Sequence, residues 1–600
     1  MKKRILWLGL SLLLVASVVL SSCGKTSTTT NVTQTTTQTT TQTGTQSTTT
    51  TAVKTTTTTT AAPIEPQYGG ILNFIGYRTA QPPTTWDLVI GNTNTDYWSD
   101  PYTEFLLTAD IAGQGPRGTN AFNFQMQETI PAQYLTGQLA ETWEQTDPLT
   151  LTFHIRHGVM WAGNAKIGMT PREFTAKDAE FSLNRYWQSP NGGANMYYLD
   201  SITADGNYTL NVKFKSYNPD WYYRIAYGIK CGFVPPEVAA AGAADWRNQV
   251  GTGPFIISDY VAGSYATYKK NPNYWGKTTI NGKEYSLPFI NELGYPVITD
   301  ESSRISAVRT GKADVGLATP TTYKNTLSAS SPDLIIFDYL KNNFYQILFK
   351  CDSGIFSNVN VRRALMIGTD LQKIANAVYP GGAEINAGPL APTLPGISTP
   401  IDEYPASTKE LFTYDPAKAT QMLADSGYPS GSITMEIMCQ SNATEIDIVS
   451  LLADMWSKLG VTVQPKPVET AVWTKYFLGK SFKNALVAST GNSNPVSSLQ
   501  YKSLNVPYNF SNWNDPKAAA LFNQAIATQD ANAQNALFKE LNIYVLDQCS
   551  MIPMPAPKLL GTYWPWVKNY YHEIEGGYQN YVPIIRLMWI DSNLKKSLGH

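Results

Sequence analysis

Cysteine and histidine are scarce in this chain of 600 residues, which contains 5 Cys and 4 His. So few cysteines cannot form a disulfide-stabilised scaffold. No His-Glu-x-x-His or Cys-x-x-Cys spacing occurs, so the common zinc-binding motifs are missing too. Acidic and basic residues nearly balance, 46 against 45, which gives a formal net charge of -1. This balance argues against a nucleic-acid-binding protein, which needs an excess of basic residues to neutralise phosphates.

Long apolar runs are also missing after the N-terminus, where basic residues at positions 2–4 precede the run Ile5–Leu20. That run has the length of a secretory signal core and is short for a membrane span. A Leu-Ser-Ser sequence ending in Cys23 follows and resembles a bacterial lipoprotein cleavage site. We expect residues 1–22 to be a signal peptide and Cys23 to carry the lipid anchor. The alternative is an uncleaved signal anchor in which Cys23 is incidental.

The segment after this cysteine is dominated by Thr, with some Gln and Ser, from residue 26 to residue 62. It has no apolar periodicity, so no core can offset the entropy lost on ordering. Residues 23–65 are therefore predicted to be a lipidated, disordered tether. Such a tether would hold a globular body just outside the membrane and keep it concentrated near a membrane partner.

Helix and strand signals alternate through the body of the chain, residues 66–600. Two strands and several capped helices can be read from apolar periodicity and from Asp-Pro or Thr-x-x-Asp starts. These signals interleave, which predicts an α/β protein rather than a helical bundle or a β-sandwich. The expected strands are Leu151–Arg156 and Val461–Val463. Three expected helices start at Thr175/Asp178, Asp415-Pro416 and Asp515-Pro516, and a fourth spans Ile446–Leu459.

No catalytic constellation is visible in the sequence, and we expect neither an enzyme nor a cofactor or metal site. His154 and His157 lie in a strand and its following turn, a position more typical of surface residues than of metal ligands. The glycines of Gly251–Pro254 are followed by a strand rather than by Lys-Ser/Thr and a helix, so they predict a tight turn and not a phosphate loop. Nucleophile elbows are absent as well. The remaining cysteines could form up to two disulfides or none: Cys231, Cys351, Cys439 and Cys549.

Aromatic residues are frequent, with 15 Trp and 35 Tyr, and many of the tryptophans fall in stretches typical of loops. An extracytoplasmic body with loop aromatics and no catalytic set is typical of a protein that captures a ligand.

Several motifs occur in the same order as in a known family. They are Gly137–Glu144, Leu151–Val159, Phe174–Arg185, Gly251–Phe255, Asn271–Lys277, Asn360–Leu365 with Thr369-Asp370, Asp415–Ala419 and Gly427–Pro429. Together they resemble the signature of family 5 extracellular solute-binding proteins, the oligopeptide, dipeptide and nickel receptors of ABC importers. The resemblance runs through almost all of residues 66–600.

This resemblance implies a two-lobed, three-domain clamshell of the type II, cluster C-like class, which closes around a ligand and then meets a membrane permease and its ATPase. The body is expected to be a monomer, with membrane contact through its lipid anchor. The chain should cross between lobes near Phe337–Phe344 and near Pro553–Pro557. The implied domain I comprises 66–95, 250–335 and 558–600, domain II comprises 96–249, and domain III comprises 336–557.

The expected ligand is an oligopeptide, with an oligosaccharide as the alternative. Peptide-binding members carry an acidic residue for the ligand's ammonium shortly before an Asp-Pro, but here Gly491 aligns with that residue and Asn494-Pro495 replaces Asp-Pro. Either the alignment slips, or another acid pairs with the ammonium, or the ligand has none. Asn side chains and loop tryptophans also suit sugars. A nickel chelate, a tethered sensor or adhesin, and an extracellular hydrolase are the further alternatives.

Expected ligand contacts lie beside the crossings, in the altered loop and on nearby loops. They are Trp86, Tyr345, Trp473, Asn492, Asn494, Asn509 and Trp513. By contrast, Arg362 and Arg363 are expected to make ion pairs within a helix, and Trp143, Trp275 and Gly276 to be packing residues that define the fold.

Overall fold

The computed structural model describes residues 65–600 apart from 78–80, 116, 120–121, 126–128, 229, 386–387, 491–493 and 507. The predicted signal peptide, the predicted lipidation site Cys23 and the Thr-rich tether up to residue 64 lie outside the described residues. None of the helices in the described ranges combines the length and the apolar character needed to cross a bilayer. The same ranges contain no cluster of three or more His, Cys, Asp or Glu side chains that could hold a metal ion.

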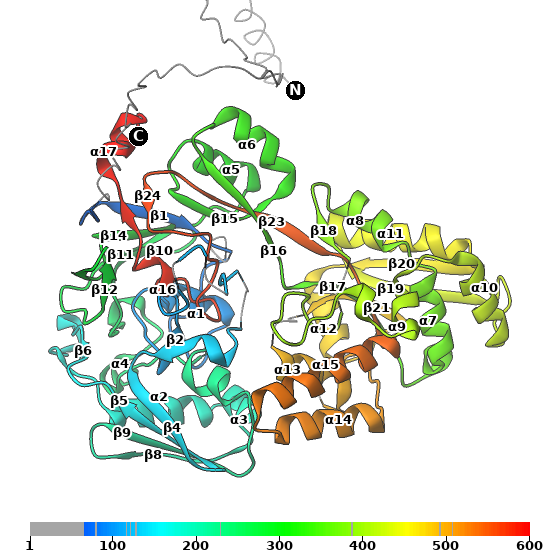
Figure 1. Cartoon of the computed structure of the whole chain (residues 1–600), viewed down its shortest axis with the longest axis horizontal. Helices are drawn as coiled ribbons and strands as arrows, with labels where there is room; N and C mark the ends of the chain where they lie inside the picture. The colour runs from blue at the N-terminus through cyan, green and yellow to red at the C-terminus, as the bar shows by residue number, and fades with distance from the viewer. Residues whose placement is uncertain are drawn as a thin grey trace, which may run out of the picture. The chain divides into compact units, whose positions relative to one another are not determined.

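The largest sheet has eight strands in the order β10-β11-β14-β1-β15-β23-β16, with β18 also paired to β23. β1 pairs in parallel with β14 and β15, whereas β23 runs antiparallel to both of its long neighbours. Its strands come from distant parts of the sequence (Figure 1). They are β1 (Ile71–Ile75), β10 (Phe255–Val261), β11 (Tyr265–Lys270), β14 (Glu292–Pro296), β15 (Val315–Pro320), β16 (Ile335–Leu340), β18 (Ala383–Glu384) and β23 (Ala556–Tyr563).

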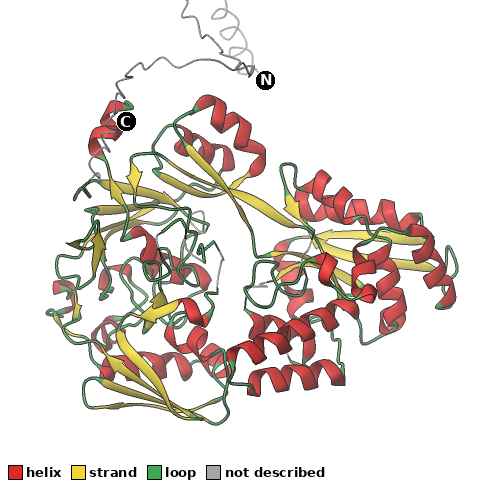
Figure 2. Ribbon diagram, in the orientation of Figure 1, coloured by secondary structure: helices red, strands yellow, loops and turns green. Residues whose placement is uncertain are grey.

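A second, five-stranded sheet has the order β20-β19-β21-β17-β22. β19 is parallel to β20 and β21, and β17 is antiparallel to β21 and β22. Helices cover this sheet (Figure 2), with α11 and α12 packed on its strands. Its strands are β17 (Phe344–Phe349), β19 (Ile433–Gln440), β20 (Val461–Val468), β21 (Ala485–Thr490) and β22 (Met551–Pro553).

A third, antiparallel sheet has the order β4-β5-β9-β8 and is covered by helix α2. Its strands are β4 (Ala140–Asp147), β5 (Thr150–Ile155), β8 (Leu199–Asp205) and β9 (Thr209–Phe214). Four two-strand ribbons complete the strands: β2 (Leu107–Ala109) with β3 (Leu135–Gly137), β6 (Met160–Trp161) with β7 (Arg172–Glu173), β12 (Lys277–Ile280) with β13 (Lys283–Ser286), and β24 (Val567–Lys568) with β25 (Trp589–Ile590).

The α-helices in the described residues between 65 and 340 are α1 (Thr93–Ser99), α2 (Ala176–Trp187), α3 (Pro190–Asn195), α4 (Pro236–Ala241), α5 (Glu301–Arg309) and α6 (Lys324–Ser330). The next group surrounds the five-stranded sheet: α7 (Val359–Ile367), α8 (Leu371–Val378), α9 (Ala406–Lys409), α10 (Pro416–Asp425), α11 (Ala443–Ser457), α12 (Thr470–Leu478), α13 (Pro495–Ser503), α14 (Pro516–Ala527) and α15 (Ala531–Asp547). The chain ends with α16 (Val582–Ile585) and α17 (Ser592–Ser597).

The chain passes directly from one sheet to the other between β16 and β17 and between β22 and β23, and the short β18, which lies between β17 and β19 in the sequence, reaches back to pair with β23 of the eight-stranded sheet. These passages, at residues 341–343 and 554–555, fall inside the two segments in which crossings were expected. We call residues 65–340 with 556–600 the eight-strand part, and residues 341–555 the five-strand part. β16 and β18 lie in the sequence range expected for domain III, yet both pair with β23. The exact domain limits therefore stay a prediction.

The local predictions that depend on neighbouring residues are confirmed, and so is the α/β class. Thr175 and Asp178 form a reciprocal capping box at the start of α2. Asp415 and Asp515 cap α10 and α14, each with proline in the first turn. The expected strand after Gly460 is β20, which is longer than expected and ends at Val468.

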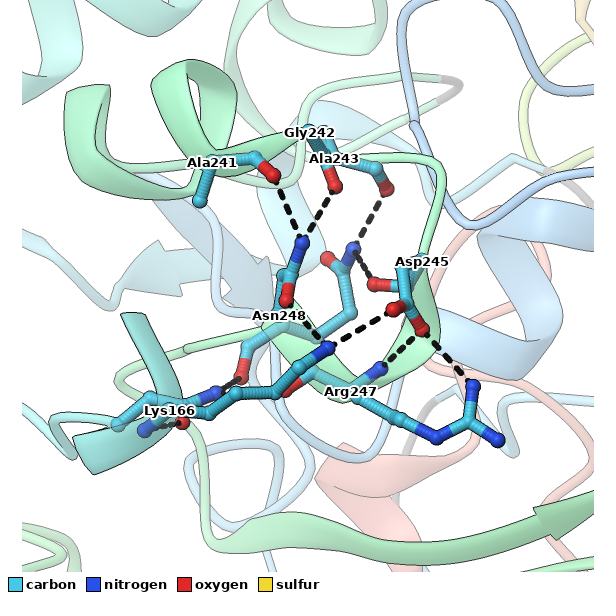
Figure 3. Close-up of polar contacts among 9 residues, drawn as sticks. Lys166, Ala241, Gly242, Ala243, Asp245, Arg247 and Asn248 are labelled. Atoms are coloured by element: carbon cyan, nitrogen blue, oxygen red, sulfur yellow. Dashed lines mark hydrogen bonds and ion pairs between the residues drawn. The ribbon is translucent and has the colours of Figure 1, made fainter. Parts of the chain in front are cut away.

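A polar network fixes the chain just before the turn that leads into β10 (Figure 3). The Lys166 ammonium donates to Asp245 and to Asn248, each at 2.8 Å. The Asn248 amide in turn donates to the carbonyls of Ala241 and Gly242 at the end of α4. These bonds satisfy carbonyl groups that the end of a short helix leaves without partners.

Candidate functional site

β21, the strand that precedes the predicted ligand loop, ends at the carboxyl edge of the five-stranded sheet. β19 and β21 are parallel, so both end at the same edge, and β17 begins there after the crossing. Ligands of α/β proteins commonly bind at such an edge, because the loops that follow the strands converge on it. Gly491 and Asn492, two of the positions singled out in the sequence, lie outside the described residues.

Tyr345 of β17 belongs to a group of polar side chains at this edge. Its side chain is half-buried, and burial raises the pKa of Tyr345 to about 12, so its hydroxyl is protonated at neutral pH. Glu445, in the first turn of α11, lies close enough to contribute to the raised pKa of both Tyr345 and Tyr379. The Tyr379 hydroxyl is buried and makes no hydrogen bond among the described residues. Hydroxyls and a carboxylate are thus gathered beside the crossing.

Glu445 is fully buried at this edge and lacks a cationic partner in the described ranges. Its carboxylate accepts from the backbone N–H of Gln440 at 2.7 Å and from the side-chain amides of Gln440 and Asn442. Burial raises the pKa of Glu445, and these donors act in the opposite direction.

Asn494, another predicted ligand contact, links the two parts of the molecule. Its side chain caps α13 by accepting from the backbone N–H of Ser497, and its amide donates to the carboxylate of Asp220 at 2.6 Å. Asp220 also accepts from the Arg224 guanidinium at 2.9 Å. Burial raises the pKa of Asp220, and Arg224 opposes that rise. The bond between Asn494 and Asp220 is buried and joins the five-strand part to the eight-strand part.

A chamber of about 340 Å³ lies directly beside this bond. Its walls come from both parts: β4, β5 and the segment after β9 on one side, and the loop after β18, the start of α13 and the corner between α14 and α15 on the other. Four aromatic side chains line it, Trp143, Tyr217, Trp221 and Tyr222, and so do prolines and side-chain amides. This volume falls within the range of small-molecule sites.

One polar atom beside the chamber is buried without a partner, whereas Gln145 and Gln534 of its lining donate to backbone carbonyls. The Thr129 hydroxyl is buried and has no hydrogen-bond partner among the described residues. Among the described lining residues, Glu144 is acidic and exposed, and none is Lys, Arg or His. The chamber therefore offers hydrogen bonds and aromatic faces but no positive charge.

The remaining predicted contacts have partners inside the protein. Trp86 packs against Tyr102 and Tyr260 in the eight-strand part. The indole N–H of Trp473 donates to the carbonyl of Val487 at 3.0 Å. Asn509 donates to the carbonyl of Trp513 at 2.6 Å, and both are buried. A direct role of these residues in ligand binding stays a prediction, because the described contacts are all within the protein.

Sequence reasoning missed most of the chamber. Trp143 was expected to be a packing residue, and it does pack on the core, but its half-buried side chain also lines the chamber. Tyr217, Trp221 and Tyr222 were not singled out, although a run of aromatics after a strand could have indicated them. Arg363 makes the expected ion pairs, with Glu410 and Asp547, whereas Arg362 binds backbone carbonyls.

The chain matches known proteins over most of its length. The family model for bacterial extracellular solute-binding proteins, family 5 Middle, matches residues 135–525, more than half of the chain. Among characterised relatives, Heme-binding protein A of Haemophilus influenzae is 26% identical over 72% of this chain and 81% of its own. Di/tripeptide-binding protein 1 of Pseudomonas aeruginosa is 24% identical over 69% of this chain and 79% of its own.

The same fold occurs in solved structures. The periplasmic binding protein DppA of Helicobacter pylori, in complex with the peptide STSA, superposes with a TM-score of 0.67 at 18% sequence identity. The superposition covers 88% of this chain and 99% of that protein. At this level of identity the likeness establishes a shared fold.

Proposed function

The chain belongs to the bacterial extracellular solute-binding proteins of family 5, and on this premise we propose that it captures a peptide between its eight-strand and five-strand parts for an ABC importer. Members of this family are transport receptors and not enzymes. The protein is accordingly an extracytoplasmic receptor of an importer. That its ligand is a peptide is our proposal.

The observation that carries the proposal is the buried hydrogen bond between Asp220 and Asn494. It spans two parts that are also joined by the chain passages at residues 341–343 and 554–555 and by the pairing of β18 with β23. Short connections between rigid sheets allow hinge motion, and a contact on the far side of the hinge fixes the closed arrangement. A ligand that bridges both parts stabilises this arrangement in the same way, so closure and capture are one event.

Peptide is the ligand class favoured by the relatives, because one of them is named for di- and tripeptides and a protein of the same fold holds a peptide. A peptide ammonium needs a carboxylate partner once it leaves water. Glu445 is our candidate for that role, since it stands at the carboxyl edge of the sheet without a cationic partner in the described ranges.

We further propose that the mature protein is a monomer, anchored to the outer face of the cell membrane through acylated Cys23. A permease and an ATPase, neither of which this chain supplies, would complete the importer. The lipid anchor and the Thr-rich tether would keep the receptor within reach of the permease.

The test is native mass spectrometry of the full-length lipoprotein in detergent, followed by sequencing of the molecules released on unfolding. We expect peptides, and a Glu445→Gln variant that releases fewer of them at a temperature at which circular dichroism shows that it is folded. Release of only non-peptide solutes, with no binding of a mixed tripeptide library, would overturn the peptide assignment. Incorporation of labelled fatty acid, lost in Cys23→Ser, tests the anchor separately.

A further inference from the structure

Lys502 is a buried cation without an acidic partner. This residue of α13 is 9% exposed, and its ammonium donates to the carbonyl of Ser498 at 3.3 Å. No Asp or Glu among the described residues pairs with it, and burial alone lowers the pKa of Lys502 to about 7. Removing an ammonium from water without a counter-charge is costly. Below neutral pH this group therefore needs either a partner from solution or the loss of its proton.

A small pocket that Lys502 helps to line has room for such a partner. The pocket measures about 30 Å³, and its walls are β17, the end of α13, residues 508–511 and the start of β22. All of these walls belong to the five-strand part, so the pocket is separate from the chamber between the two parts. A cavity of about 15 Å³ holds one water molecule. The space suits a guest of one or two heavy atoms and is too small for a phosphate, a carboxylate or a peptide side chain.

The polar walls of this pocket offer hydrogen-bond donors. Tyr501 and Tyr508 both line it, and their rings lie 5.2 Å apart. Burial raises the pKa of Tyr501, so its hydroxyl stays protonated and can donate. A hydroxyl that donates to an anion forms a charge-assisted bond, which is stronger than a bond to a neutral acceptor. Asn509 adds no donor, because its amide nitrogen already binds the carbonyls of Leu504 and Trp513.

The charge of the ammonium decides which small guest suits the pocket. A water molecule fills the space but leaves Lys502 without a counter-charge, and a cation is repelled. The described lining contains no carboxylate, and it includes the apolar side chains of Leu348, Phe510 and Met551. In such surroundings the attraction between opposite charges is stronger than in water. A chloride ion is only slightly larger than a water molecule and supplies the missing negative charge.

We propose that this pocket is a binding site for a halide ion such as chloride, held by the ammonium of Lys502 and the hydroxyls of Tyr501 and Tyr508. The site lies beneath the helix whose N-cap, Asn494, bonds to Asp220 across the two parts. An anion in the pocket stabilises the packing of this helix. The site is independent of the solute that the receptor captures, because its walls come from the five-strand part alone.

Binding of the anion depends on the proton of Lys502. Tyr501 and Tyr508 are the other titratable side chains of the described lining, and Arg224, which lies near the Tyr501 hydroxyl, stays charged. Phenol groups remain protonated below about pH 9, so Lys502 is the group that changes its charge between pH 6 and pH 9. An anion favours the charged form and raises the pKa of Lys502. Stabilisation by chloride is therefore complete at pH 6 and declines as the pH rises through that raised pKa.

The experiment is thermal unfolding of the full-length protein in detergent at pH 6, with sodium gluconate replaced stepwise by sodium chloride at constant ionic strength. We expect the midpoint to rise saturably by at least about 2 °C, and to rise less at pH 9. Lys502→Met should abolish the rise. Tyr508→Phe, which keeps the ring but removes the hydroxyl, should weaken chloride binding about threefold. Lys475→Met, at an exposed lysine of α12, is the matched control and should respond like the wild type.

Diffraction from crystals soaked in sodium bromide locates the ion directly. We expect an anomalous peak beside the ammonium of Lys502 and none there in Lys502→Met. If Lys502→Met responds to chloride as the wild type does, chloride acts elsewhere and the assignment is wrong. If chloride does not shift the wild-type midpoint at pH 6, or if bromide gives no peak in the pocket, water fills it and the assignment is equally wrong. Tyr508→Phe keeps the test valid if Lys502→Met does not fold. The release of peptides, which tests the proposed function, is a separate measurement that these outcomes leave untouched.

Discussion

The amide of Asn494 donates a 2.6 Å hydrogen bond to the carboxylate of Asp220. The donor and the acceptor of this bond cannot be exchanged, because a carboxylate has no hydrogen to donate. Asn494 must accept from Ser497 with its oxygen to cap α13, and at the same time it donates with its nitrogen to Asp220. An amide can do both, whereas a carboxylate can only accept. Asn rather than Asp before Pro495 is therefore explained by the partner that lies across the interface.

Asn494→Asp should open the molecule. The new carboxylate still caps α13 but faces Asp220 across a buried contact, where the single Arg224 guanidinium cannot neutralise both carboxylates, so they repel each other. We expect a larger radius of gyration by small-angle X-ray scattering in the presence of ligand, and a ligand affinity at least tenfold lower. Lowering the pH to about 5 should partly reverse both effects, because one of the two carboxyl groups then takes up a proton.

The control for this variant is Asn358→Asp. Asn358 caps α7 by accepting from the backbone N–H of Asn360, a contact that involves no carboxylate. This variant should scatter and bind like the wild type. The exchange Asp220→Asn with Asn494→Asp restores one donor and one acceptor and should recover part of the lost affinity. An Asn494→Asp protein that compacts and binds like the wild type would show that the contact does not govern closure.

Lys502 makes stability depend on pH. Its side chain is buried in α13, where its ammonium donates to the carbonyl of Ser498 at 3.3 Å, and burial lowers its pKa to about 7. The unfolded chain keeps the ordinary pKa of about 10.4. Between these values the unfolded state binds more protons, so this group lets stability rise with pH from about 7 to about 10 and imposes its full cost below pH 7.

Lys502→Met should consequently stabilise the protein most at low pH. At pH 6 the gain is at most about 4 kcal/mol, from a difference of about three pKa units, and it should shrink towards pH 10. Guanidinium unfolding at pH 6, 8 and 10 measures this trend. Lys475→Met, at an exposed lysine of α12, is the control and should leave the shape of the pH profile unchanged. A constant difference between wild type and Lys502→Met over this range would contradict the assigned pKa.

The four cysteines of the described part should be unreactive in the folded protein. All four are free and buried. Burial raises the pKa of Cys351 and Cys549 to about 12 and that of Cys439 to about 11, and it raises the pKa of Cys231 as well. Since the thiolate is the reactive form, iodoacetamide at pH 8 should label none of them before denaturant is added. Peptide mass mapping reads each site, and a thiol that reacts within minutes in the native protein would contradict its burial.

The sequence predicted local features well because their causes are local. The capping box of Thr175 and Asp178 and the proline-led start of α14 depend on residues three or four positions apart, so the pattern contains the whole interaction. The family resemblance added the two-lobed architecture and the two crossings. In contrast, Asp220 and Asn494 are separated by 274 positions, and no pattern in either segment indicates the other.

The chamber escaped prediction for a related reason. Trp143 lies in the strand β4, and alternating side chains of a strand are expected to pack one face on the core. The alternation does not tell which distant segment covers the other face. That face is closed by the α14–α15 corner from a distant part of the chain. Predicted contacts such as Trp473 and Asn509 were chosen because they lie near loops, but side-chain direction decides what they touch, and their hydrogen bonds point into the protein.

Arg363 offers a test of what a partly buried ion-pair network contributes. From α7 it donates to Glu410 and to Asp547 at 2.7 Å each, and it also binds the carbonyls of Asp547 and Ser407. Removal of the guanidinium leaves these acceptors unpaired in a largely buried position. Breaking such a network from one side costs about 3 kcal/mol. Arg363→Met should therefore lower the free energy of unfolding by about that amount, measured by guanidinium denaturation.

Lys418→Met is the matched control, because Lys418 binds the same Glu410 at 2.6 Å from a half-exposed position. An exposed pair is screened by water, so this variant should lose less than about 1 kcal/mol. The stability lost in Arg363→Lys should fall between these two values. An ammonium keeps the charge, but it lacks the planar fork with which the guanidinium reaches Glu410, Asp547 and two carbonyls at once. If Arg363→Met and Lys418→Met were equally stable, burial and the bonds to the carbonyls would contribute nothing, and Arg363 would act as an ordinary surface charge.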